Sequence, residues 1–73
     1  MNVPDQIQAW MFGHGCSRAE AIDQMIEHDE KTGKREIAMY GKIKNPMFVK
    51  RLARLRIIRD TERIQEKLLR REE

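Results

Sequence analysis

The sequence predicts a mainly α-helical fold, a small domain of three helices. Three observations lead to this class: apolar residues recur at helical spacing in three stretches, helix-capping residues precede these stretches, and glycines lie between them. The chain has 73 residues, enough for one domain with a thin core. Because 37% of the residues are charged, we expect a large solvated surface.

The first helix is expected over residues 5–13. Pro4 suits its first turn, since the missing N–H would be unpaired there, and Asp5 complements the helix dipole. The apolar residues of one face are Ile7, Trp10 and Met11. A turn with two glycines follows at residues 13–17 and permits a sharp change of direction.

The second helix is expected over residues 18–29, where it forms a helix-turn-helix-like pair with the first. Ser17 can serve as the N-cap, and Glu20 three residues later completes a capping box. Gly33 predicts that this helix has ended. Residues 35–45 fit neither a helix nor a strand well, so we expect irregular or short extended structure there.

A long basic C-terminal helix is expected over residues 46–70. Asn45 followed by Pro46 is a start signal, and no glycine or proline interrupts the chain after it. Opposite charges at helical spacing support the exposed surface of this helix. Glu72 and Glu73 are expected to fray.

The predicted core joins the apolar faces of all three helices. The C-terminal helix contributes one of its two apolar sides. The expected members are Ile7, Trp10, Met11, Ile22, Met25, Ile26, Phe48, Leu52 and Leu55.

A second apolar stripe lies on the opposite side of the C-terminal helix, where the short N-terminal half can no longer reach it. The partner-binding candidates on it are Ile57, Ile64 and Leu68. A helix that packs once on a small core needs one stripe, so the second is either a docking surface for another protein, a dimer contact or part of a loose tail. We therefore expect a helical domain over residues 1–58 and a tail over residues 59–73 that is helical or disordered in isolation.

The charges divide the chain into an acidic and a basic half. Residues 1–30 hold one basic group and six acids, a net charge of −5, and residues 31–73 hold fourteen basic groups and six acids, a net charge of +8. The basic run between Lys42 and Arg59 contains no acid, so it is either a solvated helix face or a contact for nucleic acid or an acidic protein surface. The contact candidates are Lys50, Arg51, Arg54, Arg56 and Arg59.

The sequence contains no motif of an enzyme, so we expect no catalysis, no cofactor and no small-molecule substrate. His14, Cys16 and His28 are metal-ligand types, but a structural zinc site needs four ligands, and no metal site is expected. A single cysteine fits a reducing cytoplasm. The absence of a long apolar run or a signal-peptide pattern favours a cytoplasmic protein that makes no contact with membranes.

The helix-turn-helix outline raises an alternative function, that of a small basic DNA-binding transcription regulator. A recognition helix must enter a groove between phosphates. The second helix offers only Arg18 as a cation and carries several acids, among them Glu20, Asp23 and Glu27, which a polyanion repels. DNA recognition by this helix is therefore disfavoured.

The full chain resembles small lytic-phage proteins that bind host bacterial RNA polymerase. The resemblance rests on the length, the opening MNVPDQIQAW (residues 1–10), the GHGCS turn (residues 13–17) and the basic C-terminal helix. It implies contacts with the large polymerase subunits near the RNA exit channel, close to nascent RNA, and cooperation with the elongation factor NusA. It also implies inhibition of initiation and antitermination by blocking the terminator hairpin, in the host bacterial cytoplasm.

Overall fold

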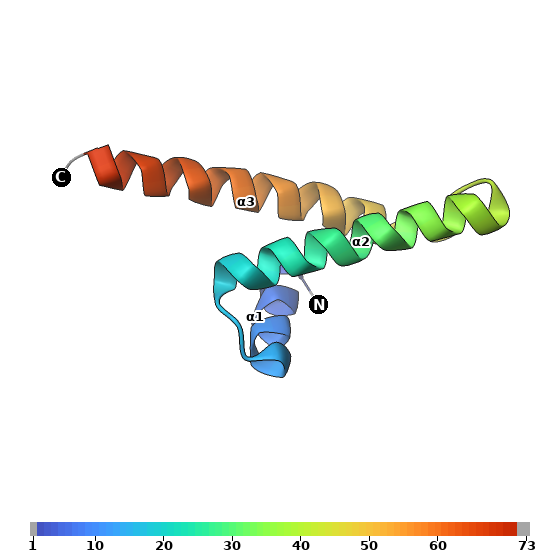
Figure 1. Cartoon of the computed structure of the whole chain (residues 1–73), viewed down its shortest axis with the longest axis horizontal. Helices are drawn as coiled ribbons and strands as arrows, with labels where there is room; N and C mark the ends of the chain where they lie inside the picture. The colour runs from blue at the N-terminus through green and yellow to red at the C-terminus, as the bar shows by residue number, and fades with distance from the viewer. Residues whose placement is uncertain (1, 72–73) are drawn as a thin grey trace.

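The computed structural model describes residues 2–71 and contains three helices, α1 (Val3–His14), α2 (Arg18–Tyr40) and α3 (Met47–Arg71). Helices α2 and α3 run antiparallel as a long hairpin, and α1 packs across the middle of it (Figure 1). The molecule is therefore a rod with a side arm, 51 × 24 × 18 Å along its principal axes. No strand occurs in the described residues, and the predicted mainly helical class is confirmed.

Helix α1 is held at both ends by its own caps. The side-chain oxygen of Asn2 accepts a hydrogen bond from the Asp5 amide at 2.9 Å, so the helix begins slightly earlier than predicted. Gly15 ends it with a φ of 62°, and its amide donates to the Met11 carbonyl. The predicted glycine turn is thus a left-handed C-cap.

Helix α2 begins as predicted but ends much later. The Ser17 hydroxyl accepts a hydrogen bond from the Glu20 amide at 3.3 Å, which confirms the N-cap. The prediction that Gly33 ends the helix, and that residues 35–45 are irregular or extended throughout, is wrong. The helix continues to Tyr40, and Gly41 ends it with a φ of 73°.

Gly33 is explained by packing. It is buried within α2, and a Cβ atom placed on it would lie 3.3 Å from Cε2 of Phe48 on α3. The small residue allows α2 and α3 to approach closely, and the helical hydrogen bonds continue through it. A glycine within a helix therefore has two meanings, and the sequence alone favoured the wrong one here.

Helix α3 begins after the predicted start signal, at Met47, whose amide donates to the side-chain oxygen of Asn45 at 3.1 Å. It runs without interruption to Arg71, across the expected domain boundary at residue 58. The expected fraying of Glu72 and Glu73 concerns residues outside the described range.

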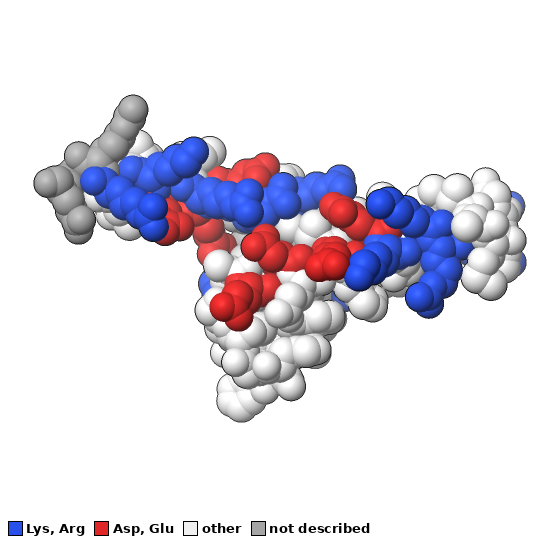
Figure 2. Space-filling model, viewed as in Figure 1, with Lys and Arg blue, Asp and Glu red and all other residues white. Residues whose placement is uncertain are grey.

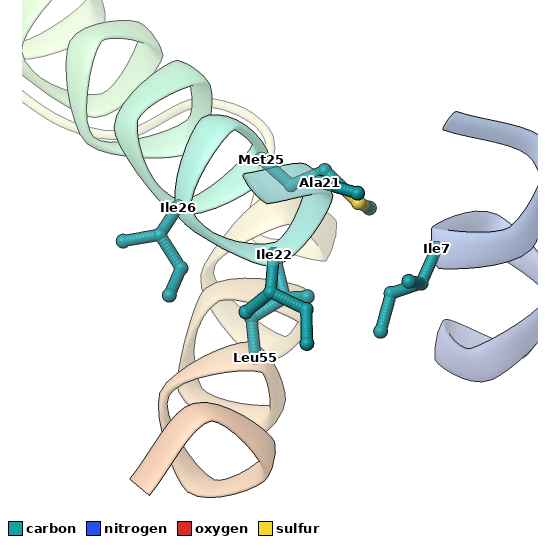
Figure 3. Packing of buried hydrophobic residues seen from close by; sticks show 6 residues of the cluster. All are labelled: Ile7, Ala21, Ile22, Met25, Ile26 and Leu55. Atoms are coloured by element: carbon teal, nitrogen blue, oxygen red, sulfur yellow. The ribbon is translucent and has the colours of Figure 1, made fainter. Parts of the chain in front are cut away.

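The core lies where the three helices meet. Figure 3 shows the side chain of Ile7 pointing from α1 toward Ile22 and Leu55. The fully buried cluster consists of Ile7, Ala21, Ile22, Met25, Ile26 and Leu55. Among the other predicted members, Trp10, Met11 and Leu52 pack against this cluster but are only half-buried, and Phe48 is half-buried against Gly33.

Across residues 2–71, no helix combines the length and the apolar character that a bilayer span requires.

Candidate functional site

The predicted basic run lies along the first half of α3, and its central member, Arg51, is an internal ion-pair partner. Two guanidinium nitrogens of Arg51 donate to the two carboxylate oxygens of Asp29. The distance from Nε of Arg51 to Oδ2 of Asp29 is 2.8 Å. The Asp29 side chain is buried, and that of Arg51 is only 27% exposed. The hydrogen bond with Asp29 raises the pKa of Arg51, burial lowers it, and the negative charge of Asp29 raises it further. Arg51 therefore ties α3 to α2.

The acidic and basic halves of the sequence face each other across the α2–α3 hairpin. Arg56 donates a hydrogen bond to Glu30 at a distance of 3.1 Å, and a nitrogen of Arg63 lies 3.7 Å from an Asp23 oxygen. Figure 2 shows the result, a band of basic side chains beside acidic ones along the long axis of the molecule. Much of the charge asymmetry in the sequence is thus neutralised between neighbouring helices.

Two of the five predicted basic contact residues have no ion-pair partner among the described residues. These are Lys50 and Arg54, and both are exposed. Arg59 lies between α2 and α3 and donates to its neighbour Asp60 at 3.3 Å. The structure therefore separates the run into Lys50 and Arg54, which are available to a partner, and Arg51, Arg56 and Arg59, which are engaged within the chain.

The predicted apolar stripe is exposed along α3. Ile57, Ile64 and Leu68 are 57%, 60% and 54% exposed. In the described part of the chain, Arg63 is the last residue of α3 that forms an ion pair with another helix. We call residues 64–70 the α3 overhang, since Figure 1 shows this end of α3 projecting past the start of α2.

A second exposed apolar region lies at the other end of the hairpin and was missed by the sequence analysis. It covers residues 34–49, which we call the hairpin end, and its exposed side chains are Ile37, Met39, Tyr40, Ile43, Met47 and Val49. The signal that could have found it was the helical spacing of Ile37 and Tyr40, which would have continued α2 past Gly33.

A shallow groove of about 410 Å³ lies between α2 and α3 at the hairpin end. The second half of α2 and the first half of α3 form its walls. Its apolar lining consists of Gly33, Ile37, Ile43, Phe48, Val49 and Leu52. The charged residues that line it are Lys34, Arg56, Asp29 and Glu30. Asp29 pairs with Arg51 and Glu30 pairs with Arg56, whereas Lys34 has no ion-pair partner among the described residues.

The metal-ligand types found in the sequence surround Trp10. The His14 ring stacks on it with centroids 4.4 Å apart, and the His28 ring meets it edge-on at 5.9 Å. The indole N–H donates to Gln24 at 2.9 Å, and the Cys16 sulfur lies 3.9 Å from the same amide oxygen. Within residues 2–71, no three His, Cys, Asp or Glu side chains come together as a metal site would require.

The first half of α2 exposes several acidic side chains, and this observation argues against the DNA-binding alternative. Arg18, its one cation near the start, donates to Glu62 of α3 at 3.0 Å. Glu20, Asp23 and Glu27 are exposed, and of these Asp23 pairs with Arg63 of α3 and Glu27 pairs with Lys31. A helix with this charge pattern is repelled by phosphates on either side of a DNA groove.

Comparison with known proteins finds no match for this chain among protein-family models, curated proteins or solved structures.

Proposed function

We propose that this chain is a non-enzymatic, phage-type regulator that binds bacterial RNA polymerase near the RNA exit channel. The observation that carries the proposal is the placement of exposed apolar side chains at both ends of a rod 51 Å long. Two such surfaces suit a protein that bridges separate elements of a large assembly. The resemblance of the full chain to polymerase-binding lytic-phage proteins supports the same partner.

Antitermination follows from occupancy of the exit channel. A rigid helical rod in that channel leaves no room for a terminator hairpin to fold, so polymerase continues past the terminator. Lys50 and Arg54, which have no ion-pair partner in the described chain, then attract the phosphates of the nascent transcript. Contacts with the large polymerase subunits also hinder initiation. NusA assists the antitermination, and both effects take place in the host bacterial cytoplasm.

The deciding experiment is in-vitro transcription across an intrinsic terminator with purified bacterial polymerase, with and without this protein and NusA. We expect a larger readthrough fraction when the protein is added, and co-sedimentation of the protein with polymerase. A template that lacks the terminator is the matched control for elongation rate. An unchanged readthrough fraction, together with no association, would reject the proposal.

One observation favours the DNA-binding alternative: α1 and α2 are joined by a three-residue turn, residues 15–17, as in a helix-turn-helix. The acidic outer face of α2 argues against it. If the protein gave a salt-sensitive mobility shift with free duplex DNA in the absence of polymerase, DNA binding would explain the chain better than polymerase binding.

A further inference from the structure

We propose that the hairpin end, residues 34–49, docks an acidic amphipathic segment of a partner protein. The proposal deepens the polymerase-binding function and rests on it for the identity of the partner. It assigns the main contact to a different surface from the α3 stripe of Ile57, Ile64 and Leu68.

Exposed apolar side chains are concentrated at the hairpin end. The hairpin end holds six of the eleven large hydrophobic residues that are exposed in the described chain, each 39–76% exposed. Scattered apolar residues are normal on a protein surface, but Ile37, Ile43 and Val49 of this group line one groove. Exposed apolar side chains gathered in this way mark a contact site. Methionine and tyrosine, which occur in it at Met39, Met47 and Tyr40, are enriched in protein interfaces.

The groove at the hairpin end has a shape that suits a helix. The groove between α2 and α3 has an apolar floor, where the Phe48 ring lies over Gly33, and Ile37 and Val49 stand on opposite walls. A shallow groove of this form accepts the apolar face of a helix. Gly33 lies at the base of the groove. The same residue that allows α2 and α3 to approach closely therefore also shapes the groove.

The hairpin end carries a surplus of positive charge. The hairpin end contains four basic residues and one acid, a net charge of +3, and the acid, Glu36, accepts a hydrogen bond from the Asn45 amide at 3.2 Å. Lys34, Arg35 and Lys42 have no ion-pair partner among the described residues. The two acids that line the groove, Asp29 and Glu30, are already paired with arginines of α3. An occupant with acidic residues beside its apolar face therefore matches the surplus positive charge of the hairpin end and the apolar floor.

The same charges argue against a symmetric contact between the hairpin ends of two copies of this chain, because two surfaces of +3 would repel each other. RNA fits the charges but leaves the apolar floor in water, since phosphates contact cations and not isoleucine or valine. A protein segment is the occupant that uses both features.

The surface is already arranged before binding. Gly41 caps α2, Asn45 caps α3 and bonds to Glu36, and the Lys44 ammonium lies 4.1 Å from the centre of the Tyr40 ring. These contacts fix the connecting loop, residues 41–46. A preorganised surface loses little conformational entropy on binding, which favours affinity.

The test compares two double variants of the full chain for binding to purified core RNA polymerase. Ile37→Asp with Val49→Asp places charge in the groove, and Ile64→Asp with Leu68→Asp is the control for the lesser contact at the α3 overhang. We expect the groove variant to bind about 30-fold more weakly, as for the loss of two anchor residues, and the control to bind only about threefold more weakly, as for the loss of a secondary contact. All four side chains are exposed, so both variants should keep the helical circular dichroism of the wild type.

If the control bound much more weakly and the groove variant bound as the wild type does, the proposal would be overturned, and the α3 stripe would be the main contact surface. If the wild-type chain does not bind polymerase at all, the proposed function fails, and a second arm decides the docking surface by itself. In it, a synthetic helical peptide with leucine on one face and glutamate on the other is titrated into the isotope-labelled chain.

Amide shifts confined to residues 34–49 would support the surface, and their absence would overturn it. A peptide with lysine in place of glutamate should bind about tenfold more weakly, because its positive charges are repelled by the positive charges of the hairpin end. If single-stranded RNA shifts the same amides at lower concentration than the acidic peptide, RNA is the occupant and the proposal is wrong.

Discussion

At the residue scale, Asp29 shows how a charge is kept in the interior of a small domain. Its carboxylate is buried and receives a two-pronged hydrogen bond from Arg51. The hydrogen bond with Asp29 and the charge of Asp29 raise the pKa of Arg51, so the arginine keeps its positive charge across the neutral range and loses it only as the pH rises into the strongly alkaline range. Such a pair stabilises only when both members are present, because either one alone is a desolvated charge.

The pair predicts strongly non-additive stability. Asp29→Ala should lower the free energy of unfolding by about 3 kcal/mol, the low end for a broken buried pair, because Arg51 retains some solvent. Asp29→Leu combined with Arg51→Met should be close to neutral, since no charge is left unpaired. Urea unfolding of both variants measures the difference, and equal losses in the two would show that the pair is not coupled.

Gly33 is the residue at which prediction from sequence failed most clearly. Local chemistry predicted a stop, but the decisive contact is with Phe48, fifteen positions away, which a single sequence does not reveal. By contrast, Ser17 and Asn45 were recognised as caps, because the bonds they make are with amides two or three residues on. Features determined by near neighbours were predictable, and features determined by packing were not.

Gly33→Ala should raise stability slightly. Alanine favours a helix interior over glycine by about 1 kcal/mol. The added methyl lies 3.3 Å from the Phe48 ring, which must move by a few tenths of an ångström, and the open groove beside that ring lets it do so. Thermal melting should therefore show a small increase for Gly33→Ala and a clear decrease for Gly33→Leu, which has no room for its side chain. A decrease for alanine would mean that the ring is fixed.

At the element scale, the α2–α3 hairpin explains why a strongly biased sequence gives a balanced molecule. The acidic residues of α2 meet the basic residues of α3 at Asp23–Arg63, Asp29–Arg51 and Glu30–Arg56. Arg51 and Arg56 were predicted as contacts for a partner, because antiparallel pairing of the two helices cannot be read from charge counts. The exposed stripe on α3, in contrast, was predictable from periodicity alone.

Helix α3 should have two levels of stability. Up to Arg63 it is tied to α2 by side-chain contacts, whereas the α3 overhang has no described ion pair with another helix and exposes Ile64, Leu68 and Leu69. An unsupported helix end of this length is marginal in water. Hydrogen exchange should therefore be fast for residues 64–70 and slow for residues 48–58, and binding to polymerase should change this only if the overhang is covered. Uniform protection in a confirmed monomer would show that the tail is ordered by itself.

At the scale of the whole molecule, function depends on which charges remain after folding. Ion pairs within the chain engage Arg51, Arg56 and Arg59 of the basic run. The hairpin end and the nearby residues Lys50 and Arg54 keep the surplus charge. Charge that is engaged within the fold contributes to stability, and charge that is free contributes to association with anionic partners. Substitutions along the basic run should therefore separate into two classes.

Lys50→Glu combined with Arg54→Glu should reduce terminator readthrough while leaving the melting temperature nearly unchanged, because exposed charges contribute at most about 1 kcal/mol to stability. Arg51→Glu should instead unfold much of the protein, since it faces the buried Asp29 with a second carboxylate. In-vitro transcription and thermal melting of the same preparations distinguish the classes, with Lys67→Glu, an exposed cation on the α3 overhang, as the matched control. Full readthrough by the Lys50/Arg54 variant would show that these cations do not act on the transcript. In that case antitermination would depend on occupancy of the channel by the rod and not on its charge.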